Sequence, residues 1–239
     1  MSPAVFEVQD LTVRFGGVTA LDGLSLRHDS GGVVGLIGAN GAGKTTFVNV
    51  LSGVVRPARG RAFLDGRDLT GLAAHKIARA GLTRTFQNLR LFGSLTVLDH
   101  LLVPYGARNH GRQRALALLA EVGLAGTESR RPAELAYGEQ RRLELARALA
   151  LDPRIVLLDE PLAGLAGSES DELLSLFGRL RDGGTTLLLI EHDVPSVLRI
   201  SDRVLVLDRG RLLADGTPAE VASDPEVRQA YLGDDDVRD

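Results

Sequence analysis

The stretch GANGAGKT at residues 38–45 constrains what this chain of 239 residues can fold into more than any other stretch. It fits the pattern G-x-x-x-x-G-K-[ST] and lies between an apolar run, 33–37, and a helical pattern. Strand, glycine loop and helix in this order form the context in which the pattern binds phosphate. Glycines let the backbone aim several N–H groups inward, and the helix start adds partial positive charge. The residues expected to bind nucleotide phosphates are Gly38, Ala39, Asn40, Gly41, Ala42, Gly43, Lys44, Thr45 and Thr46.

Two side chains of this loop have more specific expected roles. Lys44 can reach the β- and γ-phosphates of a nucleotide, and the Thr45 hydroxyl can bind Mg²⁺. The chain has only two lysines, Lys44 and Lys76, against 26 arginines, so a lysine at this position of the pattern favours function. The alternative is a glycine-rich turn that serves only to begin a helix.

Composition excludes several classes of protein. The length suits one large α/β domain, or a core with a smaller subdomain. A net charge of −3 gives no indication of nucleic-acid binding, and no apolar run approaches the length of a membrane span. The first ten residues lack the apolar centre of a signal peptide, and the absence of cysteine excludes disulfides and thiolate metal sites. Together these features predict a cytoplasmic protein.

Apolar runs alternate with helical patterns along the chain, which predicts a parallel sheet covered on both faces. Hairpins are expected near both ends, and we expect them to form an added antiparallel layer. Residues 96–125 carry apolar side chains at three- and four-residue spacing, which predicts a helical insertion. The expected strands are 33–37, 61–64, 83–86, 154–159 and 185–190; the hairpins 5–28 and 203–214; and the further helices 72–80, 140–151, 168–181 and 194–200.

Polar residues follow the expected buried strands, where a parallel sheet binds its ligands. Asp159 and Glu160 close the stretch RIVLLDE, and we expect Asp159 to help hold Mg²⁺ and Glu160 to act as general base for an attacking water. His192 follows TTLLLI and can hydrogen-bond the γ-phosphate and that water. Gln87 follows another strand and can bind Mg²⁺ or orient water. The alternatives are an Asp-Glu pair that caps a helix and a purely structural histidine, and the sequence around Gln87 alone leaves its role open.

The order of these motifs resembles an ABC-type ATPase subunit over nearly the whole chain. The segments that carry the resemblance are the phosphate loop, TFQNLRLF (85–92), LAYGEQRRLELARAL (135–149), VLLDEP (156–161) and IEH (190–192). The resemblance implies a P-loop NTPase (RecA-like) fold with a parallel-sheet core, an antiparallel β subdomain and an inserted α-helical subdomain. The implied division is 1–95 and 151–215 for the core with its β subdomain, 96–150 for the helical subdomain with the signature motif, and 216–239 for a C-terminal tail.

The resemblance also implies a second phosphate contact. In this family the signature, usually LSGGQ, binds the γ-phosphate held by the opposite protomer of a head-to-tail dimer, and Phe15 corresponds to the aromatic that stacks on adenine. Phe15 can equally serve in packing. Glu139 replaces the usual Gln, Ala136 the commoner Ser, and Ala166 a polar residue of the loop after Pro161. The signature residues here are Leu135, Ala136, Tyr137, Gly138 and Glu139.

The segments TFQNLRLF, IEHDV and QAYLGD are similar to ATP-binding subunits of branched-chain amino acid uptake systems. This similarity implies ATP and Mg²⁺ as cofactors, a homodimer or a heterodimer with a second ABC ATPase, integral-membrane permease subunits, and indirectly a periplasmic or extracellular substrate-binding protein. No nucleic acid is implied, and the expected location is peripheral, on the inner face of the cell membrane. The alternatives are a non-transport ABC ATPase, a P-loop kinase or GTPase, and a weakly hydrolysing regulatory subunit. Other amino acids, urea and short amides remain open as cargo.

Overall fold

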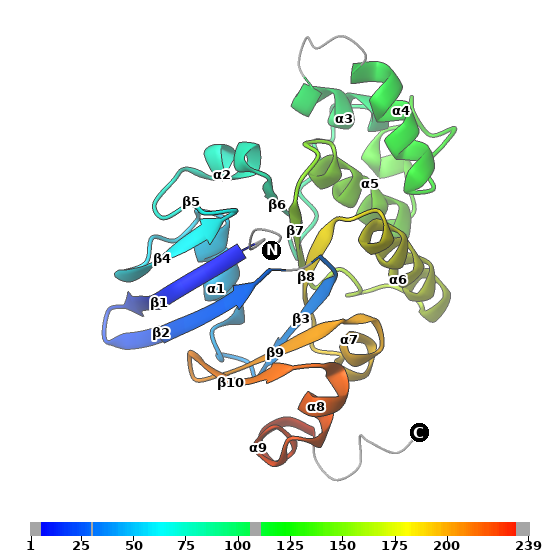
Figure 1. Ribbon diagram of the computed structural model, residues 1–239. Coiled ribbons are helices and arrows are strands. Elements are labelled where there is room, and N and C mark those ends of the chain that lie inside the picture. Colours follow the sequence, from blue (N-terminus) through cyan, green and yellow to red (C-terminus); the bar gives the residue numbers. More distant parts are fainter. Residues whose placement is uncertain (1–5, 30, 106–110, 233–239) are drawn as a thin grey trace.

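A six-stranded sheet forms the centre of the computed structural model, which describes residues 6–29, 31–105 and 111–232 (Figure 1). The strand order is β10-β9-β3-β8-β7-β6, in which the five strands from β9 to β6 run parallel and β10 is antiparallel to β9. The carboxyl ends of β8 and β7 therefore lie on the same edge as the loop that follows β3. The bounds are β3 (Val33–Gly38), β6 (Leu82–Arg84), β7 (Ile155–Asp159), β8 (Thr186–Ile190), β9 (Arg203–Asp208) and β10 (Arg211–Gly216).

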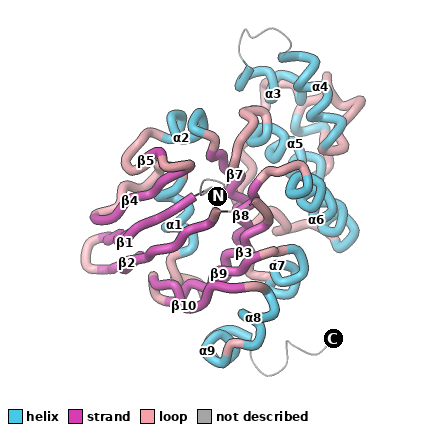
Figure 2. The backbone as a smooth tube through the Cα atoms, in the orientation of Figure 1, coloured by secondary structure: helices cyan, strands magenta, loops and turns pink. Residues whose placement is uncertain are grey.

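A second sheet of four antiparallel strands, in the order β2-β1-β4-β5, lies beside the first (Figure 2). It contains the N-terminal hairpin, as predicted, but not the C-terminal one. The prediction that both hairpins form the added layer is wrong, because β9 pairs parallel with β3 and so joins the core sheet. The bounds are β1 (Phe6–Phe15), β2 (Val18–His28), β4 (Arg59–Leu64) and β5 (Arg67–Asp68).

Alternating side chains of β3 separate two hydrophobic clusters. Val34 and Leu36 pack with α1 (Lys44–Leu51) and the second sheet in one cluster, so α1 lies between the two sheets. Val33 and Ile37 belong to the other cluster, which includes α6 (Gly167–Asp182) and α7 (Val194–Ile200). This pattern is that of a strand buried on both faces.

Three helices form a separate group at one end of the molecule (Figure 1). They are α3 (Val97–Tyr105), α4 (Gly111–Glu121) and α5 (Tyr137–Leu149), with the short 3-10 turn Pro132–Glu134 before α5. The helix predicted at 140–151 begins at Tyr137, because Glu139 Oε2 accepts a hydrogen bond from the Ala136 N–H at 2.8 Å and closes the first turn.

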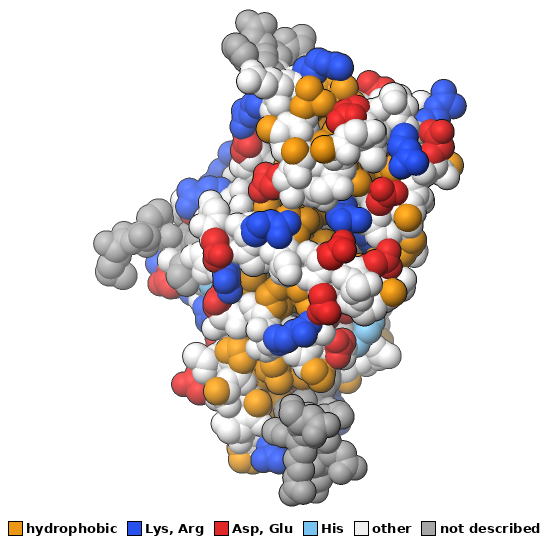
Figure 3. All heavy atoms as spheres, turned by 90° about the vertical axis from the view of Figure 1, so that its right-hand side faces the viewer, with side chains coloured by type: hydrophobic (Ala, Val, Ile, Leu, Met, Phe, Trp, Pro, Cys, Tyr) orange, Lys and Arg blue, Asp and Glu red, His pale blue; other side chains and the backbone are white. Residues whose placement is uncertain are grey.

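The remaining described helices are α2 (Ala74–Ala80), α8 (Pro218–Ser223) and α9 (Pro225–Val227), and a π-helical turn, Arg228–Leu232, follows α9. The expected tail at 216–239 extends beyond the described residues from 233 onward. Across the described ranges, no helix is both long and apolar enough to cross a membrane. Acidic and basic side chains are interspersed on the face that contains α4, α6 and α7 (Figure 3).

Candidate active site

The loop between β3 and α1 has the geometry of a phosphate cradle. Gly43 ends the loop with φ 106°, and a Cβ there would lie 2.6 Å from the Ala20 carbonyl oxygen of β2. Glycine is therefore required at this position by both conformation and space. Because α1 begins at Lys44, the first backbone N–H groups of the helix have no partner within the helix and are free to bind an anion.

The Lys44 ammonium lies against this loop. Its Nζ donates to the carbonyl oxygens of Gly38 and of Ala39, the latter at 3.1 Å, and the residue is 9% exposed. Burial lowers the pKa of Lys44, while the carboxylates of Glu160 and Asp159 act in the opposite direction. The Lys44 ammonium therefore lies near backbone N–H groups that can bind phosphate and near the carboxylates of Asp159 and Glu160, which can bind a metal.

The Glu160 carboxylate is contacted by two side chains that follow other strands of the core sheet. Gln87 Nε2 donates to Glu160 Oε2 at 2.5 Å, and His192 Nε2 lies 3.4 Å from the same oxygen. Glu160 has φ 49°, and its N–H donates to the carbonyl of Ile190 at 2.9 Å, which fixes the turn after β7. The structure thus brings together Gln87, Glu160 and His192 from the segments that follow β6, β7 and β8; the strand expected at 83–86 ends at Arg84, so Gln87 lies three residues beyond it. Their catalytic roles remain predictions.

Asp159 has a partner that the sequence reasoning missed. Its Oδ2 accepts a hydrogen bond from Arg84 Nη2 at 2.7 Å, and the two side chains are 9% and 8% exposed. Arg84 ends β6, directly beside β7. Arg84 lies in an expected strand, 83–86, that runs towards the same edge of the sheet as Asp159. This position could have indicated a contact between the two side chains.

The sequence also gave no prediction for Glu191, the residue directly before His192. It is 2% exposed, and its Oε1 accepts a hydrogen bond from the Leu162 N–H at 2.8 Å, which ties the turn after β7 to the end of β8. Burial raises the pKa of Glu191, the nearby Glu160 adds to that rise, and the Leu162 N–H and His192 oppose it. A cavity of about 450 Å³ beside this residue is lined by Gly38, Ala39, Asn40, Glu191 and His192, among others.

The signature segment occupies the first turn of α5 and its approach. Tyr137 is 42% exposed, and its hydroxyl accepts from Arg141 Nη2 at 2.8 Å and donates to the Ala163 carbonyl at 3.3 Å. Within the described ranges, no hydrogen bond or ion pair joins Leu135–Glu139 to the phosphate loop. Phe15 is 52% exposed at the turn between β1 and β2. The roles expected for Phe15 and for the signature remain predictions.

The next turns of α5 hold the segment around Gln87. Glu144 Oε1 accepts a hydrogen bond from the Phe86 N–H at 3.3 Å, and Arg141 Nη1 donates to the Phe86 carbonyl at 3.2 Å. Arg147 donates to the carbonyl of Arg90. Burial raises the pKa of Glu144, although the hydrogen bond from the Phe86 N–H and the charges of Arg147 and Arg141 oppose the rise. The helix that begins with the signature therefore also fixes the backbone beside Gln87.

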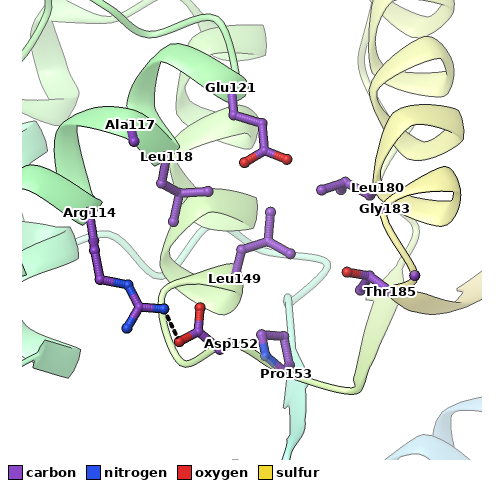
Figure 4. A pocket seen from close by; sticks show the side chains of 11 residues that line it. Arg114, Ala117, Leu118, Glu121, Leu149, Asp152, Pro153, Leu180, Gly183 and Thr185 are labelled. Atoms are coloured by element: carbon purple, nitrogen blue, oxygen red, sulfur yellow. Dashed lines mark hydrogen bonds and ion pairs between the residues drawn. The ribbon is translucent and has the colours of Figure 1, made fainter.

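A cavity of about 420 Å³ lies away from this site, between α4 and the ends of α5 and α6 (Figure 4). Its lining includes Leu118 and Leu149, and Arg114 pairs with Asp152 beside it. Asp152 and Thr185 precede β7 and β8, so this cavity lies at the amino edge of the sheet, opposite the phosphate loop.

The residues present fit a nucleoside triphosphate with Mg²⁺. Loop amides and a buried ammonium suit the phosphates, and the Asp159 carboxylate with the Thr45 hydroxyl provides the oxygen ligands that Mg²⁺ prefers. The described part of the chain holds no group of three His, Cys, Asp or Glu side chains able to bind a metal by themselves. This composition agrees with a metal that takes its remaining ligands from phosphate and water.

Comparison with known proteins supports this interpretation. Residues 21–163 match the family model of the ABC transporter, and residues 211–237 match that of the branched-chain amino acid ATP-binding cassette transporter. The high-affinity branched-chain amino acid transport ATP-binding protein BraF of Pseudomonas aeruginosa is 43% identical over 254 residues, which cover 98% of this chain and 100% of BraF.

Solved structures agree with the sequence matches. The ADP conformation of MJ1267, an ATP-binding cassette of an ABC transporter, has a TM-score of 0.88 at 29% identity and covers 97% of this chain and 99% of that chain. The dimeric structure of MJ0796, a bacterial ABC transporter cassette, has a TM-score of 0.79 at 25% identity and covers 89% and 98%. The expected resemblance and the expected fold class are confirmed. The chain belongs to the ABC transporter family, as a transporter ATPase that binds and hydrolyses ATP.

Proposed function

We propose that this chain is the ATP-hydrolysing subunit of an importer for branched-chain amino acids. The cargo is supported by the similarity to BraF over 98% of the chain and by the match at residues 211–237. The observation that carries the hydrolytic role is the convergence of Gln87 and His192 on Glu160, at the same edge of the core sheet as the phosphate loop.

In this proposal Glu160 accepts the proton of the attacking water. Gln87 and His192 both lie against Glu160 Oε2, so they hold the carboxylate in place for proton transfer. Lys44 and the loop amides stabilise the negative charge that develops on the transferred phosphoryl group. Thr45, Gln87 and Asp159 would hold Mg²⁺, which would supply further charge neutralisation at the phosphates.

A complete site requires a second ATPase subunit. The signature segment has no contact with the phosphate loop of its own chain among the described hydrogen bonds and ion pairs, and it lies at a helix start that offers backbone N–H groups. We assign Leu135–Glu139 to the γ-phosphate bound by the partner, which is a second copy or a related ATPase. Phe15 is assigned to the adenine ring, which suits its exposure at the turn of the N-terminal hairpin.

Transport further requires a permease in the membrane and, indirectly, a binding protein for the cargo outside it. We assign the helical subdomain, 96–150, and the Gln87 segment to the permease contact, and the remaining core, 1–95 and 151–215, to nucleotide binding. This assignment places the chain on the inner face of the membrane. The hydrogen bonds between α5 and the Gln87 segment support it, because they couple the helical subdomain to the site.

The hydrolytic role is tested by steady-state ATPase assays of the purified chain with Mg²⁺, beside Glu160→Gln, with both proteins also run on a sizing column in ATP. The wild type is expected to turn over, and Glu160→Gln to be inactive and to elute as an ATP-dependent dimer. A wild type that binds ATP but neither hydrolyses it nor dimerises, with or without Glu139→Gln, would contradict a self-sufficient composite site.

The cargo is tested by uptake of labelled leucine into cells that lack the chain and then receive it back. The wild type is expected to restore uptake, and Glu160→Gln to fail. Labelled urea and an acidic amino acid serve as competing cargoes. Restoration of urea uptake with no effect on leucine would reject the assignment while leaving the ATPase role intact.

A further inference from the structure

Arg84 is a buried cation at the candidate site to which the hydrolytic mechanism gives no role. It is the last residue of β6, and its Nη2 donates to Asp159 Oδ2 at 2.7 Å. The side chains of Arg84 and Asp159 are 8% and 9% exposed, so the pair is largely removed from water. Among the described residues, none donates a hydrogen bond to Asp159 Oδ1, which leaves that oxygen for another ligand.

The other end of the guanidinium reaches the phosphate-loop helix. Arg84 Nη1 donates to Asn49 Oδ1 at 2.6 Å and to Ser52 Oγ at 3.2 Å, at the C-terminal end of α1. A cation is also favoured there by the helix dipole. One planar side chain therefore joins the end of α1 to the end of β7. The same helix carries Thr45 in its first turn.

The surroundings leave the guanidinium little freedom. It lies 5.0 Å from the centroid of the Phe86 ring, and Arg84 Nε is buried without a hydrogen-bond partner. The side chain hydrogen bonds of Arg84 are thus made through its two terminal nitrogens, one to each element. A planar fork of this kind fixes the relative position of its two partners better than a flexible ammonium does.

We propose that Arg84 is a positioning residue for the metal-binding carboxylate. It holds Asp159 through Oδ2 and holds α1 through Asn49, so that Asp159 and the helix that carries Thr45 keep a fixed position relative to each other. This inference rests on the proposed roles of Asp159 and Thr45 as metal ligands. Residues that orient a metal ligand commonly change metal affinity by about 10- to 100-fold when they are removed.

A competing effect of Arg84 has the opposite sign, which makes the inference testable. A cation paired with Asp159 also weakens the attraction of that carboxylate for Mg²⁺. If this were the main effect, loss of Arg84 would lower the Mg²⁺ concentration needed for nucleotide binding. If Arg84 positions the carboxylate, its loss raises that concentration.

The experiment titrates Mg²⁺ into the full chain with a fluorescent, non-hydrolysable ATP analogue, for the wild type and Arg84→Met. The variant is expected to need about tenfold more Mg²⁺ for half-maximal binding. Its affinity for the analogue in EDTA is expected to stay close to that of the wild type, because the loop and Lys44 are unchanged. An unchanged or lowered Mg²⁺ requirement would overturn the inference.

A matched control is Arg203→Met. Arg203 donates to both carboxylate oxygens of Asp215, at 2.6 Å each, in the β9–β10 hairpin. Its loss is expected to lower the melting temperature, as the loss of Arg84 does, without any change in the Mg²⁺ requirement. An equal rise of the Mg²⁺ requirement in both variants would show a general loss of stability and would reject a positioning role.

Asn49→Ala provides a second variant in case Arg84→Met does not fold. It keeps the Arg84–Asp159 pair but removes the main contact of the guanidinium with α1. We expect a smaller rise of the Mg²⁺ requirement, and no rise would contradict the inference. If the wild type itself bound no nucleotide, the proposed function would fail. If the wild type bound nucleotide and both variants had the same Mg²⁺ requirement as the wild type, only this inference would fail.

Discussion

In the Glu160 carboxylate, Oε2 contacts neighbouring side chains, whereas Oε1 has no such contact among the described residues. Gln87 and His192 both lie against Oε2, and among the described hydrogen bonds and ion pairs none involves Oε1. A general base must lie within hydrogen-bonding distance of the proton that it removes. Oε1 is therefore the oxygen to which we assign the attacking water. The two neighbours restrict the rotation of the carboxylate that would accept its proton.

His192→Ala is predicted to slow hydrolysis with little effect on nucleotide binding. The imidazole lies 3.4 Å from Glu160, and among the described hydrogen bonds none joins it to the phosphate loop, so its loss should act on the reacting water. We expect kcat to fall by about 100-fold and the Kd for ATP to change less than threefold, by the usual size of such effects. His75→Ala on α2, which is exposed, is the control. An equal loss in both kcat and affinity would mean that His192 mainly binds nucleotide.

Glu191→Gln is predicted to change how stability depends on pH. Because burial raises the pKa of Glu191 in the folded state, the folded protein keeps a proton that the unfolded chain has already lost at the ordinary glutamate pKa of 4.5. The contribution of Glu191 to the unfolding free energy is therefore full below that pKa and falls as pH rises towards the folded-state pKa.

The amide of Glu191→Gln cannot lose a proton, yet its oxygen can still accept the Leu162 N–H. The variant should consequently gain stability relative to the wild type as pH rises from 4.5, with a slope of at most about 1.4 kcal/mol per pH unit. Urea unfolding of both proteins at pH 5, 6 and 7 measures the difference. A difference that stays constant over this range would mean that Glu191 titrates as an ordinary carboxyl group.

The sequence predicted those site residues whose position in a pattern defines them. Lys44 and Thr45 belong to a contiguous motif, and Asp159 and Glu160 close an apolar strand. Arg84 and Glu191 escaped prediction because each acts through a neighbour that is distant in the sequence, Asp159 at the end of β7 and Leu162 in the turn after β7. Strand order determines such contacts, and no local pattern of residue types contains that order.

At the scale of elements, α5 connects two parts of the site that are far apart in the sequence. Its first turn carries the signature, and its following turns hold Phe86 through Arg141 and Glu144. Tyr137 adds a contact to Ala163 in the loop after β7. A movement of this helix must therefore also move the backbone beside Gln87.

Glu144→Ala is predicted to loosen the Gln87 segment. The change removes the acceptor of the Phe86 N–H, and we expect hydrogen exchange at that amide to accelerate by about tenfold, which corresponds to the loss of about 1.4 kcal/mol. Glu144→Gln keeps an oxygen acceptor and should exchange more slowly than Glu144→Ala. Both variants leave Arg141 and Arg147 without their carboxylate, so their difference isolates the hydrogen bond. Equal exchange in the two variants would contradict this role of Glu144.

The elements themselves were largely predictable, and two of the differences have clear physical causes. The C-terminal hairpin joins the core sheet because Val204 to Leu207 pair with β3, a contact that spans most of the chain. Alternation of apolar residues identifies a strand but not its partner. The helix expected at 140–151 begins three residues earlier because the Glu139 side chain closes a first turn that contains a glycine.

At the scale of the whole molecule, the two helix N-termini to which we assign phosphate binding are those of α1 and α5. The first lies at the carboxyl edge of the core sheet with Lys44, and the second begins a helix of the separate α-helical group. In the composite site that we propose, a second subunit in head-to-tail orientation would bring the start of α5 of one chain to the phosphates held by the other. The structure of MJ0796, a bacterial ABC transporter cassette, is described as dimeric.

Glu139 allows a test of that arrangement. Its carboxylate should stabilise helix α5 within one chain but should weaken binding between the two chains of the proposed dimer. Within the chain, Oε2 accepts the Ala136 N–H at 2.8 Å, and a negative charge at a helix N-terminus stabilises the helix by about 0.3–1 kcal/mol. Across the dimer, the same charge would lie near the partner's γ-phosphate and repel it.

Glu139→Gln keeps an oxygen for the Ala136 N–H and removes the charge. We therefore expect slightly lower stability of the single chain but a stronger ATP-dependent dimer, with the larger gain at low salt because charge repulsion is screened at high salt. Sedimentation of Glu160→Gln with and without Glu139→Gln, in ATP at low and high salt, measures the effect. Glu134→Gln is the control, since Glu134 makes the same kind of cap to the Arg131 N–H at 2.6 Å outside the signature. If the dimer were no stronger with Glu139→Gln than with Glu134→Gln, Glu139 would lie away from the partner's phosphates, and the composite site would have to be assembled from another face of α5.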